Sequence, residues 1–195
     1  TIRQLLSHTS GLAPYRPFHR MGLTTAEAVR QAILADTLVY APGTEARYSD
    51  LGMIVLGWVI ERITGQPLDA YAQAHIFQPL GMRHTRFRPV GWSDSTVVPT
   101  EVDTIFRHRL LQGEVHDETA WILGGVAGHA GVFSTAADLA RFAYMLVNEG
   151  RIGGRQFLKP ETIRLFTTPV DPPRAGTRAL GWDTKSPQGY TSAGR

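Results

Sequence analysis

The chain has 195 residues, a formal net charge of +3 and no cysteine. Its 43% hydrophobic and 19% charged residues are typical of a globular protein, and its length is enough to bury one sizeable core. The small, scattered charge argues against nucleic-acid binding. The lack of cysteine excludes a disulfide framework, a thiolate nucleophile and a cysteine-ligated zinc site.

The local patterns predict mainly helices, with a start or stop signal at most of their ends. In chain order the predicted helices cover residues 1–8, 25–35, 50–64, 67–77, 134–150 and 159–168. Shorter alternating segments predict strands at residues 84–90, 95–100 and 178–184, and residues 170–178 are predicted to form a loop. Thr24 and Glu27 form a capping box for the second helix, and Gly65 and Gly150 end the third and the fifth.

Two of these helices carry most of the predicted core. The helix over residues 50–64 is apolar almost all round, which predicts a buried helix with Trp58 and Val59 in the core. Its apolar run is far shorter than the ~20 residues that cross a bilayer, so it predicts no membrane span. The helix over residues 134–150 begins at Thr135 and has an apolar stripe on one face. The stripe consists of Leu139, Phe142, Met145 and Leu146.

A tyrosine, a serine and an aspartate stand together before the first of these helices, as Tyr48, Ser49 and Asp50. Free tyrosine has a pKa of about 10, so its hydroxyl works as a base only where a cation or an aligned dipole stabilises the phenolate. The N-terminus of a rigid helix supplies such a field. Ser49 or Asp50 can cap this helix, and from the residues alone two interpretations of the tyrosine stay open. Tyr48 has a chemical role, or it is a packing aromatic beside a capping Asp50.

Common catalytic signatures are absent from the sequence. It contains no Ser-x-x-Lys, Gly-x-Ser-x-Gly, His-Glu-x-x-His, Walker A or Gly-x-Gly-x-x-Gly pattern. Its 7 histidines show no metal-ligand spacing, so no metal site is predicted.

Four segments carry a family resemblance. They are residues 1–12 (TIRQLLSHTSGL), 47–87 (beginning RYSDLGMIVLGW), 113–142 (GEVHDETAWILGGVAGHAGVFSTAADLARF) and 179–184 (ALGWDT). In this order they resemble the class C beta-lactamase-like serine hydrolases, which include beta-lactamases, low-molecular-mass penicillin-binding proteins and serine esterases. The resemblance implies an α/β (α+β) chain with the beta-lactamase/D,D-peptidase-like fold. It also implies that residues 1–195 are a single incomplete domain, mostly the helical lobe with few strands of the flanking antiparallel sheet.

The resemblance also implies an activity. Enzymes of this family use Ser-x-x-Lys, Tyr-x-Asn and a Lys-Thr-Gly or His-x-Gly strand motif to cleave esters or amides through an acyl-enzyme. Only the middle motif is visible here, which makes Tyr48 and Asp50 the candidate catalytic residues. We expect the chain to be the interior of a larger serine hydrolase and to be inactive alone. The alternative is a non-catalytic module that binds peptidoglycan or a partner.

The third letter of the middle motif departs from the family. Asp50 stands where asparagine is usual, and an ionised aspartate only accepts hydrogen bonds, whereas asparagine also donates them. The resemblance gives the asparagine position a part in holding the amide side chain of a beta-lactam. Asp50 therefore favours an esterase or a peptidase over a beta-lactamase.

Candidate substrate-binding residues lie in the third segment. His116 and Asp117 match a His-Asp pair of some penicillin-binding-protein relatives, and Gly128 and His129 lie in a glycine-rich loop that either lines a cleft or is a structural turn. The His-x-Gly letters beginning at His129 precede a capped helix, so they are not assigned to the strand motif. The family implies no cofactor, a small ester, beta-lactam or peptidoglycan peptide as substrate, and a periplasmic or cell-envelope location. An isolated helical lobe would expose apolar surface, which favours self-association.

Overall fold

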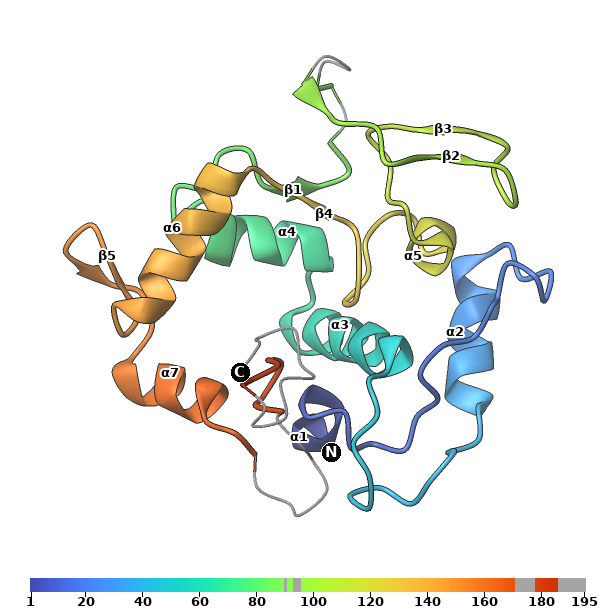
Figure 1. Cartoon of the computed structure of the whole chain (residues 1–195), viewed down its shortest axis with the longest axis horizontal. Helices are drawn as coiled ribbons and strands as arrows, with labels where there is room; N and C mark the ends of the chain where they lie inside the picture. Colours follow the sequence, from blue (N-terminus) through green and yellow to red (C-terminus); the bar gives the residue numbers. More distant parts are fainter. Residues whose placement is uncertain (90, 93–95, 171–177, 186–195) are drawn as a thin grey trace. The chain divides into compact units, whose positions relative to one another are not determined.

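The computed structural model describes residues 1–89, 91–92, 96–170 and 178–185 (Figure 1). Its helices are α1 (Ile2–Leu6), α2 (Ala26–Ala35), α3 (Asp50–Thr64), α4 (Leu68–Ala72), the π-helix η1 (Gln73–Phe77), α5 (Glu118–Ile122), α6 (Ala136–Val147) and α7 (Pro160–Thr167). Its strands are β1 (Arg86–Phe87), β2 (Glu101–Asp103), β3 (Arg109–Leu111), β4 (Val132–Phe133), β5 (Arg151–Ile152) and β6 (Arg155–Gln156). The chain forms two compact units. The first is Thr1–Tyr15, Asp36–Leu56 and Ala140–Arg195, and the second is Arg16–Ala35 and Gly57–Leu139.

In the first unit, the chain that follows α1 turns against residues 38–40. Gly11 makes this contact possible, because its φ is +85° and a Cβ there would lie only 2.3 Å from the Tyr40 carbonyl oxygen. The Val39 amide donates to the Gly11 carbonyl at 2.8 Å. This turn fixes the loop that begins at His8.

A short segment near residue 180 joins two helices of the first unit. The Leu180 amide donates to the Phe166 carbonyl in α7, and the Gly181 amide donates to the Leu6 carbonyl in α1. Leu180 is itself buried. The segment therefore connects the first and last helices of the described chain.

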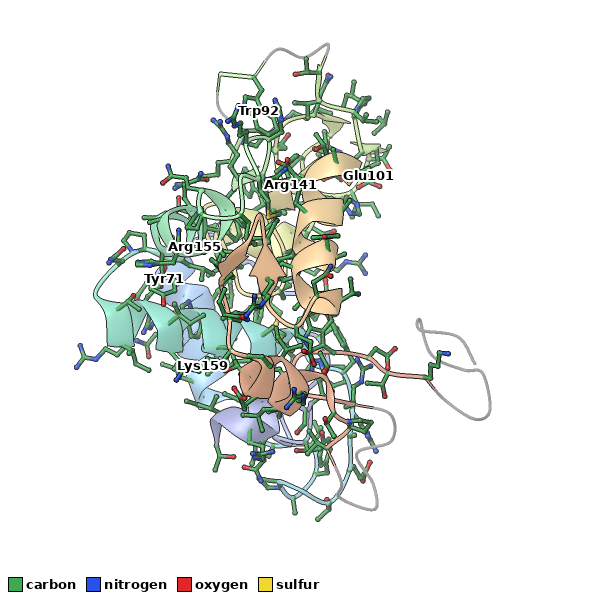
Figure 2. The ribbon with its side chains drawn as sticks, turned by 90° about the vertical axis from the view of Figure 1, so that its left-hand side faces the viewer. Tyr71, Trp92, Glu101, Arg141, Arg155 and Lys159 are labelled. Atoms are coloured by element: carbon green, nitrogen blue, oxygen red, sulfur yellow. The ribbon has the colours of Figure 1, made fainter. Side chains whose placement is uncertain are left out.

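In the sequence, the hairpin of β5 and β6 follows α6 and precedes α7. Figure 2 shows Arg155 on this hairpin and Lys159 just before α7. The Gly150 carbonyl accepts hydrogen bonds from the Phe157 and Leu158 amides, at 2.8 and 3.2 Å. These bonds anchor the hairpin at the end of α6.

Two small antiparallel sheets belong to the second unit. In one, β1 pairs with β4, with Arg86 opposite Phe133. In the other, β2 pairs with β3, with Val102 opposite Leu110, and these two side chains are 64% and 50% exposed. Leu111 lies on the other face of this hairpin and is buried, as the alternation of a strand requires. Helices α2 and α5 lie side by side in the same unit (Figure 1).

The start of α6 is tied to the segment before β1. The buried Asp138 carboxylate accepts the His84 amide at 2.7 Å and the Thr85 hydroxyl at 2.9 Å. Thr135 caps the helix, because its hydroxyl accepts the Asp138 amide at 3.2 Å. These bonds hold β1 and, through its pairing, β4.

Buried apolar side chains fill the interior of both units. In the first unit they include Ala13, Leu51, Ile54, Met145, Ala179 and Leu180. In the second unit they include Phe18, Val29, Ile33, Phe77, Leu80, Met82, Leu111, Ala120 and Ile122.

Helix bounds agree with the sequence patterns where a cap or a glycine marks an end. Helix α3 occupies the predicted residues 50–64, and α1, α6 and α7 lie within their predicted ranges. The predicted capping box of α2 is wrong. Thr25 rather than Thr24 caps the helix, since its hydroxyl accepts the Ala28 amide at 3.2 Å. Glu27 instead accepts a hydrogen bond from a side chain one turn further along.

Three predicted core positions are wrong. Trp58 and Val59 are only half-buried. The Arg30 guanidinium carbon lies 4.8 Å from the centroid of the Trp58 ring, so this ring packs against a charged side chain and not inside the apolar core. Leu139 is 55% exposed, and Met145 is the fully buried side chain of the α6 stripe.

The predicted strands are mostly displaced. Strand β1 lies within residues 84–90 as predicted, but residues 96–100 precede β2 and form no strand. Pro99 has no amide hydrogen to donate, so the ladder starts after it. The predicted strand at 178–184 is reduced to one antiparallel bridge. The predicted loop at 170–178 falls mostly outside the described residues.

Candidate functional site

Tyr48 lies in the loop that leads into α3, two residues before the helix begins. Ser49 caps the helix: its hydroxyl accepts the Gly52 amide at 3.1 Å and donates to the Ala13 carbonyl at 2.7 Å. Ser49 is buried, whereas the Tyr48 residue is 49% exposed. The backbone around Tyr48 is therefore fixed while its side chain stays accessible.

Asp50 is the first residue of α3 and is half-buried. Its amide donates to the Pro14 carbonyl at 2.9 Å. Of the two candidate caps, Ser49 is confirmed and Asp50 is wrong, because the Ser49 hydroxyl accepts the Gly52 amide. A carboxylate in the first turn still interacts favourably with the positive end of the helix dipole.

A buried histidine packs against Tyr48. The centroids of the His8 and Tyr48 rings lie 4.7 Å apart, and the rings are tilted by 41°. The Ser49 amide donates to His8 Nδ1 at 3.1 Å, so the neutral ring carries its proton on Nε2. Burial and, to a smaller extent, the Arg178 charge lower the pKa of His8 from 6.5 to about 4, and the Asp183 charge partly opposes them. His8 is thus a neutral imidazole at ordinary pH.

The positively charged side chain of Arg178 also lies near Tyr48. The Arg178 guanidinium carbon lies 5.9 Å from the centroid of the Tyr48 ring. Arg178 also pairs loosely with Asp183, at 4.0 Å between nitrogen and oxygen. Tyr48 therefore has a neutral imidazole, a guanidinium and the start of α3 around it. We call His8, Tyr48 and Arg178 the tyrosine cluster.

A second cluster lies in the second unit, at the start of α5. Asp117 caps this helix, because its Oδ1 accepts the Ala120 amide at 2.7 Å, and the same oxygen bonds His129 Nε2 at 2.9 Å. Burial opposes the ionisation of Asp117, but the bonds from His129 and Ala120 outweigh it and hold the pKa of this carboxyl below its ordinary value. We call Asp117 and His129 the aspartate–histidine pair.

His129 is the more enclosed member of this pair. Its side chain is 3% exposed. Its Nδ1 atom is buried, and the described residues offer it no hydrogen-bond partner. The ring therefore has one satisfied and one unsatisfied nitrogen.

The other two predicted substrate-binding residues do not join this pair. His116 Nε2 instead bonds Glu101 Oε1 at 2.8 Å, and both side chains are largely exposed, with Glu101 on the β2–β3 hairpin in Figure 2. Gly128 packs on α3: a Cβ added at Gly57 would lie 3.1 Å from the Gly128 nitrogen. The loop approaches the helix this closely because residue 57 has no side chain.

A cavity of about 320 Å³ adjoins the aspartate–histidine pair. Its lining residues are Thr100, Glu114, Val115, His116, Asp117, Ala130, Gly131, Val132 and Phe133. Two of the four predicted substrate-binding residues, His116 and Asp117, thus line it. Gly128 and His129 do not.

A buried ion pair that the sequence patterns missed supports one wall of this cavity. Arg107 Nε donates to Asp103 at 2.8 Å, and the two side chains are 4% and 5% exposed. Arg107 also donates to the Val115 carbonyl at 2.7 Å. The Phe106 amide, the Arg107 side chain and further amides lower the pKa of Asp103 well below its ordinary range. No helical pattern marks this segment, so the spacing of four residues gave no signal.

The part of the chain that the structure describes holds no group of three or more His, Asp or Glu side chains arranged to bind a metal ion. None of its helices is long and apolar enough to cross a membrane.

The helices and short antiparallel sheets have the fold of beta-lactamases and penicillin-binding proteins. A D-stereospecific amidohydrolase from Streptomyces matches 93% of this chain and 55% of its own, with 25% identity and a TM-score of 0.64. A "putative beta-lactamase" from Bacteroides dorei matches 85% of this chain and 41% of its own, with 31% identity and a TM-score of 0.60.

The sequence assigns the family within this fold. The family model described as Beta-lactamase matches residues 1–194, so the chain belongs to the beta-lactamase family. An Escherichia coli K12 protein named "Putative D-alanyl-D-alanine carboxypeptidase" is 38% identical over 158 residues, which cover 74% of this chain. The match covers only 36% of the length of that relative.

Proposed function

We propose that the protein containing this chain is a serine hydrolase that cleaves the terminal amide bond of peptides ending in D-alanine. The observation that carries the proposal is the tyrosine cluster, in which the half-exposed Tyr48 is held at the start of α3 beside Arg178. The names of the Escherichia coli relative and of the Streptomyces amidohydrolase support a substrate with D-configured residues.

Tyr48 would move protons in this reaction. A guanidinium beside its ring and the positive end of a helix both favour negative charge on the phenolic oxygen. Such an oxygen can accept the proton of an attacking serine hydroxyl and then donate it to the amine that leaves. The serine oxygen forms a bond to the carbonyl carbon, the carbon–nitrogen bond breaks, and water later hydrolyses the acyl-enzyme.

The nucleophile is proposed to lie outside these 195 residues. None of the serines in the sequence has a lysine three residues further on. Ser49 is the serine nearest to Tyr48 in the sequence. It is buried and its hydroxyl caps α3, so it is not proposed as the nucleophile. The chain would supply the tyrosine of the site.

His116 and Asp117 are the proposed substrate-binding residues. Both line the cavity of about 320 Å³, which has the size of a small peptide group. His129 would keep Asp117 oriented through their 2.9 Å bond, and Gly128 would keep the loop against α3. Asp50 can only accept hydrogen bonds when ionised, which favours a peptide or ester over a beta-lactam.

The test uses the full-length protein and a synthetic peptide ending in D-Ala-D-Ala, with a p-nitrophenyl ester as a second substrate. We expect D-alanine release and stoichiometric labelling of one serine by a fluorophosphonate. Tyr48→Phe should lower kcat about 10²- to 10⁴-fold, the usual contribution of a positioned acid–base group. Tyr144→Phe is the matched control, because Tyr144 is 57% exposed on α6 and does not belong to the tyrosine cluster.

The outcome also separates the alternatives. A labelled, active protein that cleaves only the ester would be an esterase. Wild-type kcat in Tyr48→Phe would contradict the role of Tyr48. A full-length protein that binds peptidoglycan but neither labels nor cleaves would be the non-catalytic module.

A further inference from the structure

A single buried residue, His8, contacts three consecutive residues around Tyr48. Its carbonyl accepts the Arg47 amide at 2.9 Å, and its Nδ1 accepts the Ser49 amide at 3.1 Å. Its ring packs at 4.7 Å on the ring of Tyr48. One residue therefore fixes the backbone on both sides of Tyr48 and one face of its side chain.

His8 is itself held firmly in the first unit. It is only 4% exposed, and its carbonyl also accepts the Tyr40 hydroxyl at 3.0 Å. Its φ is +56°, a conformation that is sparsely populated without glycine and persists only where surrounding bonds maintain it. On either side of it, the buried Ser7 and Thr9 hydroxyls bond each other at 2.9 Å. The fold thus maintains an unfavourable backbone conformation to keep this ring in place.

The role of His8 depends on its neutral state. An imidazolium has a proton on both ring nitrogens, so it cannot accept the Ser49 amide. The groups that face the ring are Tyr48, Arg178 and Asp183, together with the backbone of Ser49. Burial and the Arg178 charge lower the pKa of His8 to about 4. The ring therefore stays an acceptor down to mildly acidic pH.

We propose that His8 is a positioning residue for Tyr48: its neutral ring orients the phenol for proton transfer, and protonation of the ring releases it. This inference rests on the proposed function of Tyr48. It goes further by naming the residue through which acid would inactivate the site. His8 itself needs no contact with the substrate.

The first test compares His8 variants of the full-length protein in steady-state kinetics. His8→Leu should lower kcat about 10- to 100-fold with KM changed less than about threefold, because a misplaced group loses rate at this scale. His8→Asn should recover kcat to within about fivefold, because its Oδ1 can take the place of Nδ1 and asparagine tolerates positive φ. Wild-type kcat should fall as His8 becomes protonated, and His8→Asn should lack that step.

The control is the half-buried His19 of the second unit. Both ring nitrogens of His19 are buried, with no hydrogen-bond partner in the described residues, and its ring lies 5.3 Å from that of Phe106. His19→Phe should therefore leave kcat and its pH profile unchanged. Wild-type kcat in His8→Leu, together with a loss in Tyr48→Phe, would overturn the role of His8 and leave the proposed function intact.

A second measurement does not depend on turnover. In the 195-residue chain, the ring protons of Tyr48 and His8 can be followed by NMR against pH. We expect both to shift with one midpoint well below 6.5, and the Tyr48 shift to vanish in His8→Asn. Separate midpoints, or a Tyr48 shift that survives in His8→Asn, would overturn the coupling even if Tyr48→Phe leaves turnover unchanged.

Discussion

The tyrosine cluster and the aspartate–histidine pair both contain a buried histidine at the start of a helix, but opposite chemistry holds the two rings. His8 accepts a backbone amide from Ser49, the cap of α3. His129 bonds the carboxylate of Asp117, the cap of α5. Protonation would break the first bond, because an imidazolium cannot accept a hydrogen bond, whereas a carboxylate only needs a donor. Only the first bond therefore depends on a neutral imidazole.

The largest effect is expected when the carboxylate of the aspartate–histidine pair is removed. Asp117→Ala deletes the cap of α5 and leaves His129 Nε2 buried without its partner, so the free energy of unfolding should fall by about 2–4 kcal/mol. Urea denaturation measures this loss. Asp117→Asn keeps a capping oxygen and should lose only about 1 kcal/mol. Equal losses in the two variants would contradict the dual role of this carboxylate.

An acid titration should separate the two regions. The folded pKa of His8 lies below its unfolded value, so the unfolded state binds more protons between pH 6.5 and about 4. The stability that His8 contributes is thus complete above pH 6.5 and is lost as pH falls towards 4. The loss should reach about 3 kcal/mol, because one pKa unit corresponds to about 1.36 kcal/mol. The contribution of Asp117, whose pKa is lowered, should persist over this range.

Amide hydrogen exchange can follow both regions in one sample. Protection of the Ser49 and Gly52 amides should weaken between pH 6 and 4, while that of the Ala120 amide should not. His8→Asn should abolish the difference. Earlier loss of protection at Ala120 than at Ser49 would contradict the claim that the His8–Ser49 bond is the one that needs a neutral imidazole.

The smallest expected effect concerns Asp50. Because Ser49 and not Asp50 caps α3, Asp50→Asn removes only a favourable interaction with the helix dipole, worth about 0.3–1 kcal/mol. Ser49→Ala, which loses the cap, should cost about 1–2 kcal/mol. Thermal denaturation ranks the two. In the full-length protein, Asp50→Asn should still shift the pH–rate profile, because it removes a carboxylate two residues from Tyr48.

Local signals predicted the helices better than the other elements. Ser49, Asp50 and Gly65 mark the ends of α3, so its bounds could be read directly from the sequence. Helix α5 has five residues and was missed, because so short a helix shows no periodicity. The β2–β3 hairpin was also missed, since its strands have three residues each and no two-residue glycine turn joins them.

In the candidate site, too, the features set by neighbouring residues could be predicted and the long-range contacts could not. Tyr48 and Asp50 are neighbours in the sequence, so their position at the start of a helix could be predicted. His8 lies 41 residues from Ser49, and only the folded chain brings them together. The bond between Asp117 and His129 spans 12 residues, and both were named as candidates without being predicted to pair. Contacts that depend on tertiary structure carry no periodic signal.

The β2–β3 hairpin has a practical consequence for handling this chain. In the described residues it is a sheet of two strands only, so each strand has an open edge that can pair with another molecule. Its outer face carries Val102 and Leu110, which are 64% and 50% exposed. Such a ribbon is a ready template for aggregation at high concentration, and charged Glu101 and Arg109 act against it. A lysine in place of Val102 is the first substitution to try when purified material precipitates.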